Sequence, residues 1–356
     1  LCVVFLLCLR YFFVGPTLLA LLAAIATIVA MFGAPNAQAQ QLNLLCNAAI
    51  DWCELMKNKF EAETGIKTNM TRRSSGESYA QVRAESANPK IDVWWAGTGD
   101  PHLQAAAEGL TEVYKSPTLP KLQPWANKVA EASGFRTVGI YLGALGFAYN
   151  NQTLASKKLA APKCWADLAD PKFKDEVQMP DPNSSGTAYT MLATLVQVMG
   201  EEKAFAYFKN LHKNVNQYTK SGIAPSQAVG RGETAVGISF MHDLMIAKVG
   251  GFPVTLVTPC EGTGYEIGSM SIIKGARNMV EAKKFYEFAL RPDIQSLAPQ
   301  AKSYQIPSHT EAKVPAEAIK PSDVKLIDYD QAKYGSSETR KRLLARWGSE
   351  VTSAPK

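Results

Sequence analysis

The chain has 356 residues, of which 46% are hydrophobic and 20% are charged, and its formal net charge is +6. Residues 1–39 are strongly apolar, with Arg10 as their one ionised side chain, and without them 317 residues with a net charge of +5 remain. This length suits two domains. The small positive excess forms no basic run, so it gives no case for a nucleic-acid partner.

Residues 1–39 have the pattern of a secretory signal peptide. An apolar stretch from Pro16 to Phe32 precedes Ala37-Gln38-Ala39, and a small-x-small sequence after an apolar segment is typical of a cleavage site. A transmembrane anchor is the alternative, because about 20 apolar residues can span a bilayer. We expect cleavage near Ala39 and export of a freely soluble mature chain.

Predicted strands and helices alternate along the rest of the chain. Apolar runs and alternating patterns predict strands at 42–45, 66–70, 91–95, 177–179, 235–240, 254–257 and 269–273. Helical spacing predicts helices at 52–64, 78–85, 102–109, 191–199, 204–211, 224–229 and 278–290, and a terminal amphipathic helix with Leu343, Leu344 and Trp347. This order predicts an α/β fold of two lobes, each a mixed, mainly parallel sheet flanked by helices.

The predicted domains follow from this order. After the signal peptide at 1–39, we expect the first part of lobe 1 at 40–146 and lobe 2 at 147–262. Residues 263–356 would return to lobe 1 and supply the C-terminal helices. Strands that cross between the lobes would leave a cleft, and ligands of open α/β sheets bind beyond the carboxyl ends of strands.

Cys46, Cys53, Cys164 and Cys260 remain after removal of the signal peptide. An even number in an exported protein favours two disulfides, and the spacings suggest Cys46–Cys53 and Cys164–Cys260, although the sequence does not choose among three connectivities. A zinc site is the alternative, but no C-x-x-C and no paired histidines accompany the cysteines. We therefore predict no metal site.

Two loops that lie between a strand and a helix are candidates for anion binding. A helix N-terminus presents free N–H groups and a positive dipole end. In the first loop Ser74 and Glu77 also fit a capping box, the alternative explanation, whereas no acidic residue has that spacing in the second loop. The predicted ligand contacts are Ser74, Ser75 and Gly76 from the first loop, and Asn183, Ser184, Ser185, Gly186 and Thr187 from the second. Arg73 or Lys220 would contribute a charge if it points inward.

Further candidates lie in other loops that follow strands. Thr98 could hydrogen-bond a ligand, although Asp100 before Pro101 also fits a helix cap. Tyr218 and Ser221 offer an aromatic face and a hydroxyl, with a solvated connection as the alternative. The side chains of His242, Asp243 and Glu266 suit the vicinal hydroxyls of a sugar, unless His242 is simply a satisfied core residue.

Motifs for catalysis or cofactors are absent from the sequence. There is no Gly-x-Ser-x-Gly elbow, no phosphate-binding loop of the Gly-x-x-x-x-Gly-Lys type and no dinucleotide fingerprint. We therefore expect a protein that is not an enzyme and that carries no cofactor.

The joint pattern resembles the extracellular solute-binding proteins of ABC importers, in the branch usually labelled ferric-iron-binding. The resemblance rests on the leader, the Ser74-Ser75-Gly76 loop, Asp92-Val93-Trp94-Trp95-Ala96-Gly97-Thr98-Gly99-Asp100, and the segment 218–233. Iron binders of this branch ligate the metal through two adjacent tyrosines, and this chain offers Tyr304-Gln305-Ile306-Pro307 instead. Its pattern is more similar to that of the hexose-phosphate-binding members, and this similarity rests on Cys46 to Cys53, Arg73-Ser74-Ser75-Gly76-Glu77, Gly97-Thr98-Gly99-Asp100-Pro101-His102, Met241-His242-Asp243 and Glu266.

This resemblance implies the two-lobed periplasmic-binding-protein fold of type II. It also implies that Ser74 contacts the phosphate, and that His242, Asp243 and Glu266 contact the sugar. We therefore expect a monomeric periplasmic protein that captures a small anionic solute, with a sugar phosphate favoured, by closing its lobes and delivers it to a membrane permease. A carrier of ferric iron, a phosphonate or another anion is the alternative within the family. A secreted phosphatase-type hydrolase, or an adhesin or scaffold, would belong to another class.

Overall fold

The computed structural model describes residues 40–356, so the predicted signal peptide and its cleavage site lie outside the described residues. The strands are β1 (Gln41–Cys46), β2 (Lys67–Arg72), β3 (Val93–Thr98), β4 (Val138–Asn150), β5 (Val177–Pro180), β6 (Val215–Thr219), β7 (Val236–Phe240), β8 (Val254–Val257), β9 (Tyr265–Ile272) and β10 (Ile306–Pro307). The helices are α2 (Ile50–Thr64), α3 (Ser75–Ala84), α4 (Gly99–Ala107), α5 (Pro124–Ala132), α6 (Asn151–Lys157), α7 (Gly186–Met199), α8 (Glu201–His212), α9 (Ala224–Arg231), α10 (Met241–Val249), α11 (Met279–Leu290), α12 (Pro292–Gln295), α13 (Gln331–Tyr334) and α14 (Ser337–Trp347).

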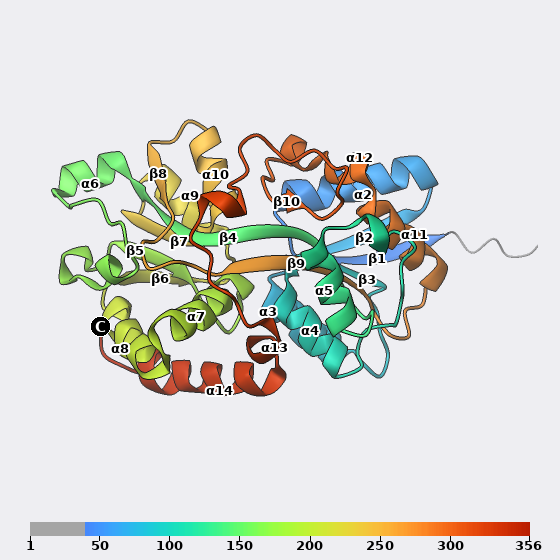
Figure 1. The fold of residues 1–356 in the computed structure, drawn as a ribbon, viewed down its shortest axis with the longest axis horizontal. Helices are drawn as coiled ribbons and strands as arrows, with labels where there is room; N and C mark the ends of the chain where they lie inside the picture. The colour runs from blue at the N-terminus through green and yellow to red at the C-terminus, as the bar shows by residue number, and fades with distance from the viewer. Residues whose placement is uncertain (1–39) are drawn as a thin grey trace, which may run out of the picture. The chain divides into compact units, whose positions relative to one another are not determined.

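One mixed sheet runs through residues 41–356. Its strand order is β2-β1-β3-β9-β4-β7-β5-β6, and β8 and β10 also pair with β4. The pairs of β1 with β2 and β3, and of β5 with β6 and β7, are parallel. The long strands β4 and β9 lie antiparallel to each other and cross the centre of the molecule (Figure 1). The predicted α/β fold, with helices flanking mainly parallel strands in each half, is confirmed.

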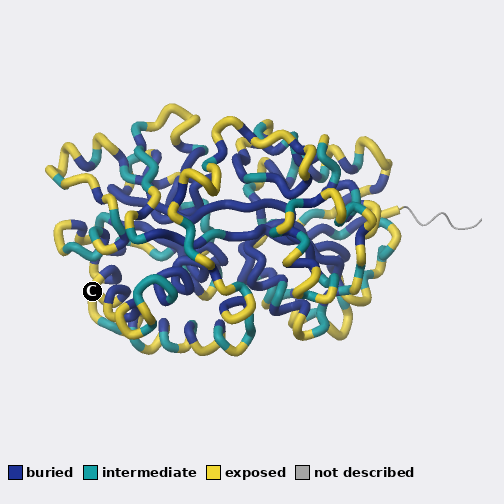
Figure 2. Tube along the Cα trace, viewed as in Figure 1, coloured by how far each residue is buried: buried dark blue, intermediate teal, exposed yellow. Residues whose placement is uncertain are grey.

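Two hydrophobic cores divide the sheet into two lobes. Lobe 1 gathers around Trp52 and Trp95, whose rings meet edge to face at 5.0 Å, and includes β1, β3, α2 and α11. Lobe 2 gathers around Phe205 and Phe208 of α8 and includes β5, β7 and α7. The central strands β3, β4, β5, β7 and β9 are buried along most of their length (Figure 2). We use lobe 1 and lobe 2 in this sense below.

The C-terminal part of the chain divides between the lobes, contrary to our expectation. Strand β9 pairs with β3, and Phe285 of α11 packs in the lobe 1 core. The terminal helix α14 instead places Leu343 and Trp347 in the lobe 2 core, where Trp347 meets Phe208 at 5.3 Å. Phe208 of α8 supplies the apolar contact for Trp347, so the prediction that α14 returns to lobe 1 was wrong. The other domain boundaries stay predictions, and the one at residue 146 falls inside β4.

Both suggested disulfides are present. Cys46 pairs with Cys53 across a Cα–Cα distance of 6.0 Å, and Cys164 pairs with Cys260 across 4.8 Å. The first closes a short loop at the start of α2, and the second joins two distant segments. Within residues 40–356, none of the helices has the length and apolar character that a membrane crossing requires.

Candidate functional site

Residues of both lobes line one cleft of about 460 Å³, a volume that includes its opening to solvent. Nine of the fourteen predicted ligand contacts line it: Ser74, Ser75, Thr98, Ser185, Gly186, Thr187, His242, Asp243 and Glu266. The structure therefore brings together side chains that are up to 192 residues apart in the sequence.

Six helices begin at this cleft. The residues that immediately precede α2, α3, α4, α7, α9 and α10 all line it, namely Ala49, Ser74, Thr98, Ser185, Ile223 and Phe240. Each helix start carries about half a positive charge on unpaired N–H groups. Acidic residues lie in the first turns of α2, α3, α4 and α10 but not in those of α7 and α9, so the starts of α7 and α9 are the ones that can attract an anion without an opposing charge.

The two predicted anion loops differ in how their helix starts are satisfied. At α3 the Glu77 carboxylate accepts a hydrogen bond of 3.2 Å from the Ser74 N–H, so the capping box that we gave as the alternative does form. At α7 no side chain caps the helix, and its first turn holds no acidic residue. The N–H groups of Gly186 and Thr187 are therefore the better anion donors.

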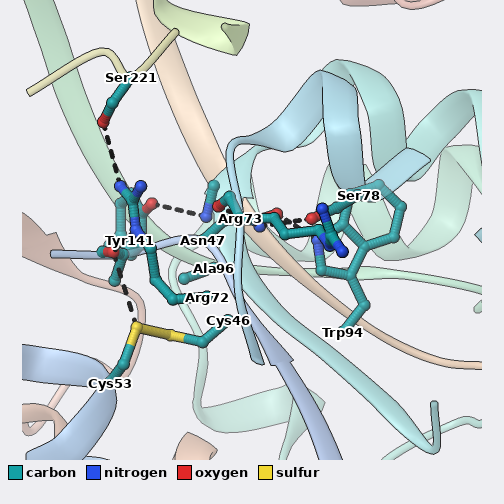
Figure 3. The surroundings of a disulfide bond; sticks show 12 residues. Cys46, Asn47, Cys53, Arg72, Arg73, Ser78, Trp94, Ala96, Tyr141 and Ser221 are labelled. Atoms are coloured by element: carbon teal, nitrogen blue, oxygen red, sulfur yellow. Dashed lines mark hydrogen bonds between the residues drawn. A yellow bond between two sulfur atoms is a disulfide. The ribbon is translucent and has the colours of Figure 1, made fainter. Parts of the chain in front are cut away.

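The charge that faces the cleft comes from Arg72, not from Arg73 or Lys220. Arg72 ends β2, and its guanidinium donates from Nε to the Ala48 carbonyl and from Nη2 to the Ser221 hydroxyl, each at 3.2 Å (Figure 3). Arg73 and Lys220 are exposed and do not line the cleft. Burial lowers the pKa of Arg72 from its ordinary value, but an arginine keeps its proton at neutral pH.

The bond from Arg72 to Ser221 joins the two lobes. Ser221 follows β6 of lobe 2, whereas Arg72 and Ala48 belong to lobe 1. Ala48 lies inside the loop that the Cys46–Cys53 disulfide closes, and Figure 3 shows this disulfide near Arg72. The disulfide therefore restrains the carbonyl that holds the arginine in place.

His242, Asp243 and Glu266 converge at one end of the cleft. Nε2 of His242 lies 3.4 Å from Oε1 of Glu266 and 3.8 Å from Oδ1 of Asp243. The imidazole stacks on Phe240 at 5.4 Å and fits against Gly143, where a Cβ atom would lie 2.7 Å from Cε1 of His242. This group offers several hydrogen-bonding atoms to the hydroxyls of a sugar.

Burial controls the protonation of this group. It lowers the pKa of His242 to about 3, so the imidazole is neutral. It raises the pKa of Asp243 to about 7, although the Ser239 hydroxyl, at 3.3 Å, and the charge of Arg72 both favour the carboxylate. Burial, together with the negative charge of Asp243, raises the pKa of Glu266 well above its ordinary value.

A bulge in β3 places Thr98 at the cleft. The register with β9 shifts between Trp95 and Thr98, and Ala96 and Gly97 adopt positive φ angles of 69° and 84°. The Gly97 N–H donates to the Tyr141 hydroxyl at 3.0 Å, and the Thr98 N–H donates to Oγ of Ser75 at 3.2 Å. Oγ1 of Thr98 is buried beside Gly186 without a hydrogen-bond partner among the described residues.

Five predicted contacts do not line the cleft. The Gly76 N–H donates to the Ser184 carbonyl at 3.1 Å, so Gly76, Ser184 and the neighbouring Asn183 meet where lobe 1 touches lobe 2. Ser221 accepts from Arg72. Tyr218 points into the lobe 2 core, where its hydroxyl lies 2.9 Å from Nδ1 of His212.

Sequence reasoning missed several cleft residues: Asn47, Ala48, Ala49, Arg72, Gly97, Tyr141, Gly222, Ile223, Phe240 and Gln305. Asn47, Ala48 and Ala49 lie between β1 and the start of α2. This position between a strand and a helix is the same pattern by which we selected the other loops. Gln305 stands beside Tyr304, the residue in the region where iron binders carry their tyrosine pair. Tyr304 itself is buried and does not line the cleft.

Comparison with known proteins places the chain in a family. A relative from Haemophilus influenzae, described as an uncharacterized protein, is 46% identical over 334 residues, which cover 93% of this chain and 96% of the relative. The structure of the periplasmic binding protein AfuA from Actinobacillus pleuropneumoniae, with exogenous fructose 6-phosphate bound, is 45% identical at a TM-score of 0.86, covering 88% of this chain and 99% of AfuA. That of the periplasmic binding protein P5PA is 39% identical at a TM-score of 0.85, covering 88% and 100%.

These neighbours are binding proteins, not enzymes, as the sequence predicts for this chain. The model of the family described as bacterial extracellular solute-binding protein matches residues 88–334, which span most of both lobes. The chain therefore belongs to the bacterial extracellular solute-binding proteins, the periplasmic binding components of ABC importers.

Proposed function

We propose that this protein captures a hexose phosphate in the periplasm and delivers it to the permease of an ABC importer. The observation that carries the proposal is that the two sides of the cleft present different chemical groups. One side presents the start of α7, which has no acidic residue in its first turn, and the other presents the cluster of His242, Asp243 and Glu266, of which the first two lie in the first turn of α10. A phosphate suits the first side and sugar hydroxyls suit the second.

The donor set favours a phosphate ester over a bare metal ion. Ser75, Ser185 and Thr187 supply hydroxyls next to the start of α7, and Arg72 supplies one positive charge. Ferric iron would require several hard anionic ligands, and the cleft instead contains only two carboxylates, both with raised pKa values. The similarity to AfuA, solved with fructose 6-phosphate bound, supports the same ligand class.

Calorimetry tests the proposal directly. We expect saturable binding of glucose 6-phosphate or fructose 6-phosphate, and no binding of unphosphorylated glucose at the same concentration. Asp243→Ala should remove most of the binding, because it deletes a buried acceptor for sugar hydroxyls. Tyr218→Phe is the matched control, because its hydroxyl lies in the lobe 2 core. Tight binding of Fe(III) without heat from any sugar phosphate would disprove the proposal.

Two further features belong to the same proposal. The signal peptide is cleaved near Ala39, which N-terminal sequencing of the exported protein would establish. The mature protein acts as a monomer that closes its lobes around the ligand, so its small-angle scattering profile should become more compact when glucose 6-phosphate is added.

A further inference from the structure

Glu266 is the most secluded acidic group of the cleft. Its side chain is 3% exposed, compared with 16% for Asp243. Within residues 40–356, the ion-pair contacts of Glu266 are limited to the neutral imidazole of His242 at 3.4 Å. A buried carboxylate without a cation or hydrogen-bond donors loses the stabilisation that water gives its charge.

The other ionisable groups packed around Glu266 are acidic carboxyl groups and neutral phenols, with no cation among them in the part of the chain that the structure describes. Asp243 on α10, Asp100 on α4 and the Tyr141 hydroxyl on β4 all face the same region. Tyr265 on the same strand and Tyr329 in the C-terminal segment share a small cavity with Glu266 and Asp100. Arg72 on β2 faces Asp243, and Arg340 on α14 faces Asp100, so each cation compensates a carboxyl other than Glu266.

Asp243 and Glu266 therefore differ in how their charge is supported. Asp243 accepts from the Ser239 hydroxyl at 3.3 Å and lies near Arg72. Glu266 has neither kind of support, although both carboxyl groups approach the same nitrogen of His242. When two buried carboxyl groups lie close together, the one with the poorer support holds the proton.

We propose that Glu266 takes up one proton when the lobes close on a hexose phosphate, so that solute capture is linked to protonation of this carboxyl group. This inference rests on the proposed function. The protonated carboxyl can donate to a sugar oxygen, which a carboxylate cannot do. It also removes one negative charge from a cleft that must accommodate a phosphate dianion.

The direction of the pH effect follows from the raised pKa of Glu266 in the closed cleft. In open lobes, where water reaches the side chain, the carboxyl is ionised above about pH 4.3. Closure at neutral pH then consumes a proton, and affinity should fall by up to tenfold for each unit of rising pH. The ligand acts oppositely near pH 6, because a phosphate monoester becomes a dianion there.

Calorimetry separates the protonation of Glu266 from the ionisation of the phosphate ligand. Binding of glucose 6-phosphate is measured at pH 6, 7 and 8 in buffers with different ionisation enthalpies, which gives the number of protons taken up. Three proteins are compared: wild type, Glu266→Gln, and Glu131→Gln on the exposed surface of α5 as a matched control. A glutamine keeps an oxygen and a donor but cannot titrate.

At pH 7 we expect wild type and Glu131→Gln to take up about one proton more per ligand than Glu266→Gln. The slope of log affinity against pH should differ by about one between wild type and Glu266→Gln. Equal uptake in wild type and Glu266→Gln would overturn the inference while leaving hexose-phosphate binding intact. If proton uptake persists in Glu266→Gln but disappears in Asp243→Asn, the proton belongs to Asp243. This result would also overturn the inference.

A spectroscopic readout on wild-type protein covers the case in which Glu266→Gln does not bind. Infrared difference spectra should show a new carboxylic-acid C=O band when glucose 6-phosphate is added at pH 7, and no such band when glucose is added. Binding without this band overturns the inference alone. Failure of wild type to bind any hexose phosphate overturns both the inference and the proposed function.

Discussion

Gly186 offers a test of whether the lobes must meet for ligand capture. It is the first residue of α7 in lobe 2, and it packs against Thr98 at the end of β3 in lobe 1. A Cβ atom at this position would lie 2.8 Å from Cγ2 of Thr98 and closer still to Oγ1. We predict that Gly186→Ala weakens the closed state without harming the fold.

The size of the effect follows from this overlap. Ordinary contact between such atoms begins at 3.4 Å, and Oγ1 lies closer than Cγ2, so the lobes must separate locally by more than about 0.6 Å or Thr98 must change its rotamer. Overpacking of this kind costs about 1–3 kcal/mol, which corresponds to roughly 5-fold to 150-fold weaker binding. Opening of the lobes removes the overlap, and alanine is the better helix former, so the free energy of unfolding should not decrease.

Calorimetry with glucose 6-phosphate and thermal unfolding without ligand together measure this prediction. Gly348→Ala is the matched control, because Gly348 has helical dihedral angles at the end of α14 and a Cβ there would meet nothing within 4 Å. We expect unchanged binding in Gly348→Ala and a similar melting temperature in both variants. Wild-type affinity in Gly186→Ala would show that the cleft does not close as the structure has it.

Three other predictions address separate parts of the structure. Arg72→Gln removes a charge-assisted hydrogen bond worth about 1.5–3 kcal/mol, so it should weaken glucose 6-phosphate binding at least tenfold, whereas Arg73→Gln should not; equal losses would contradict the assignment of Arg72 to the cleft. Tyr218→Phe should lower the free energy of unfolding by about 1 kcal/mol, since it loses the bond to His212, and a loss of ligand affinity instead would place Tyr218 at the site. Replacing Cys164 and Cys260 together by serine should lower stability by about 2–4 kcal/mol in urea unfolding, and no change relative to the oxidised wild type would show that this disulfide does not stabilise the fold.

Local patterns predicted helix α2 of lobe 1 well, although they predicted no helix at the position of α5. Trp52, Met56 and Phe60 recur at helical spacing, and all three are buried on one face of α2. Gly65 ends this helix with a φ of 71°, and its N–H donates to the Glu61 carbonyl. Spacing and a left-handed cap are properties of a few consecutive residues, so the sequence contains them in full.

The local sequence pattern was not sufficient to predict whether Arg72 or Arg73 faces the cleft. We expected the strand to end at residue 70, but β2 continues to Arg72, which pairs with Cys46 of β1. Successive side chains of a strand face opposite ways, so two extra residues of pairing decide which arginine faces the cleft. That length depends on β1, a partner whose register the sequence of β2 does not specify.

Tyr218 and α14 illustrate the same limit at longer range. The sequence around Tyr218 has the pattern of a ligand-binding loop, and that of α14 has the pattern of an amphipathic helix. In the structure, the ring of Trp347 in α14 packs against the ring of Tyr218 at 5.9 Å. The terminal helix thus covers the side chain that would otherwise be available to a ligand. Neither segment alone reveals this contact, because 129 residues separate the two rings.

The cleft shows why a binding site for a charged solute needs few charged side chains. Under the proposed function, closing two lobes on a phosphate dianion would remove its hydration, so the protein would have to replace water with fixed donors. On one side, these donors are the starts of helices α7 and α3, the hydroxyl groups of the lining serines and threonines, and the guanidinium of Arg72. On the other side, two carboxylates would oppose the same anion, and raised pKa values relieve that repulsion by keeping a proton in the cluster. The arrangement of neutral donors and the proposed proton on Glu266 would therefore be two consequences of the same requirement, that little net negative charge be buried when the lobes meet.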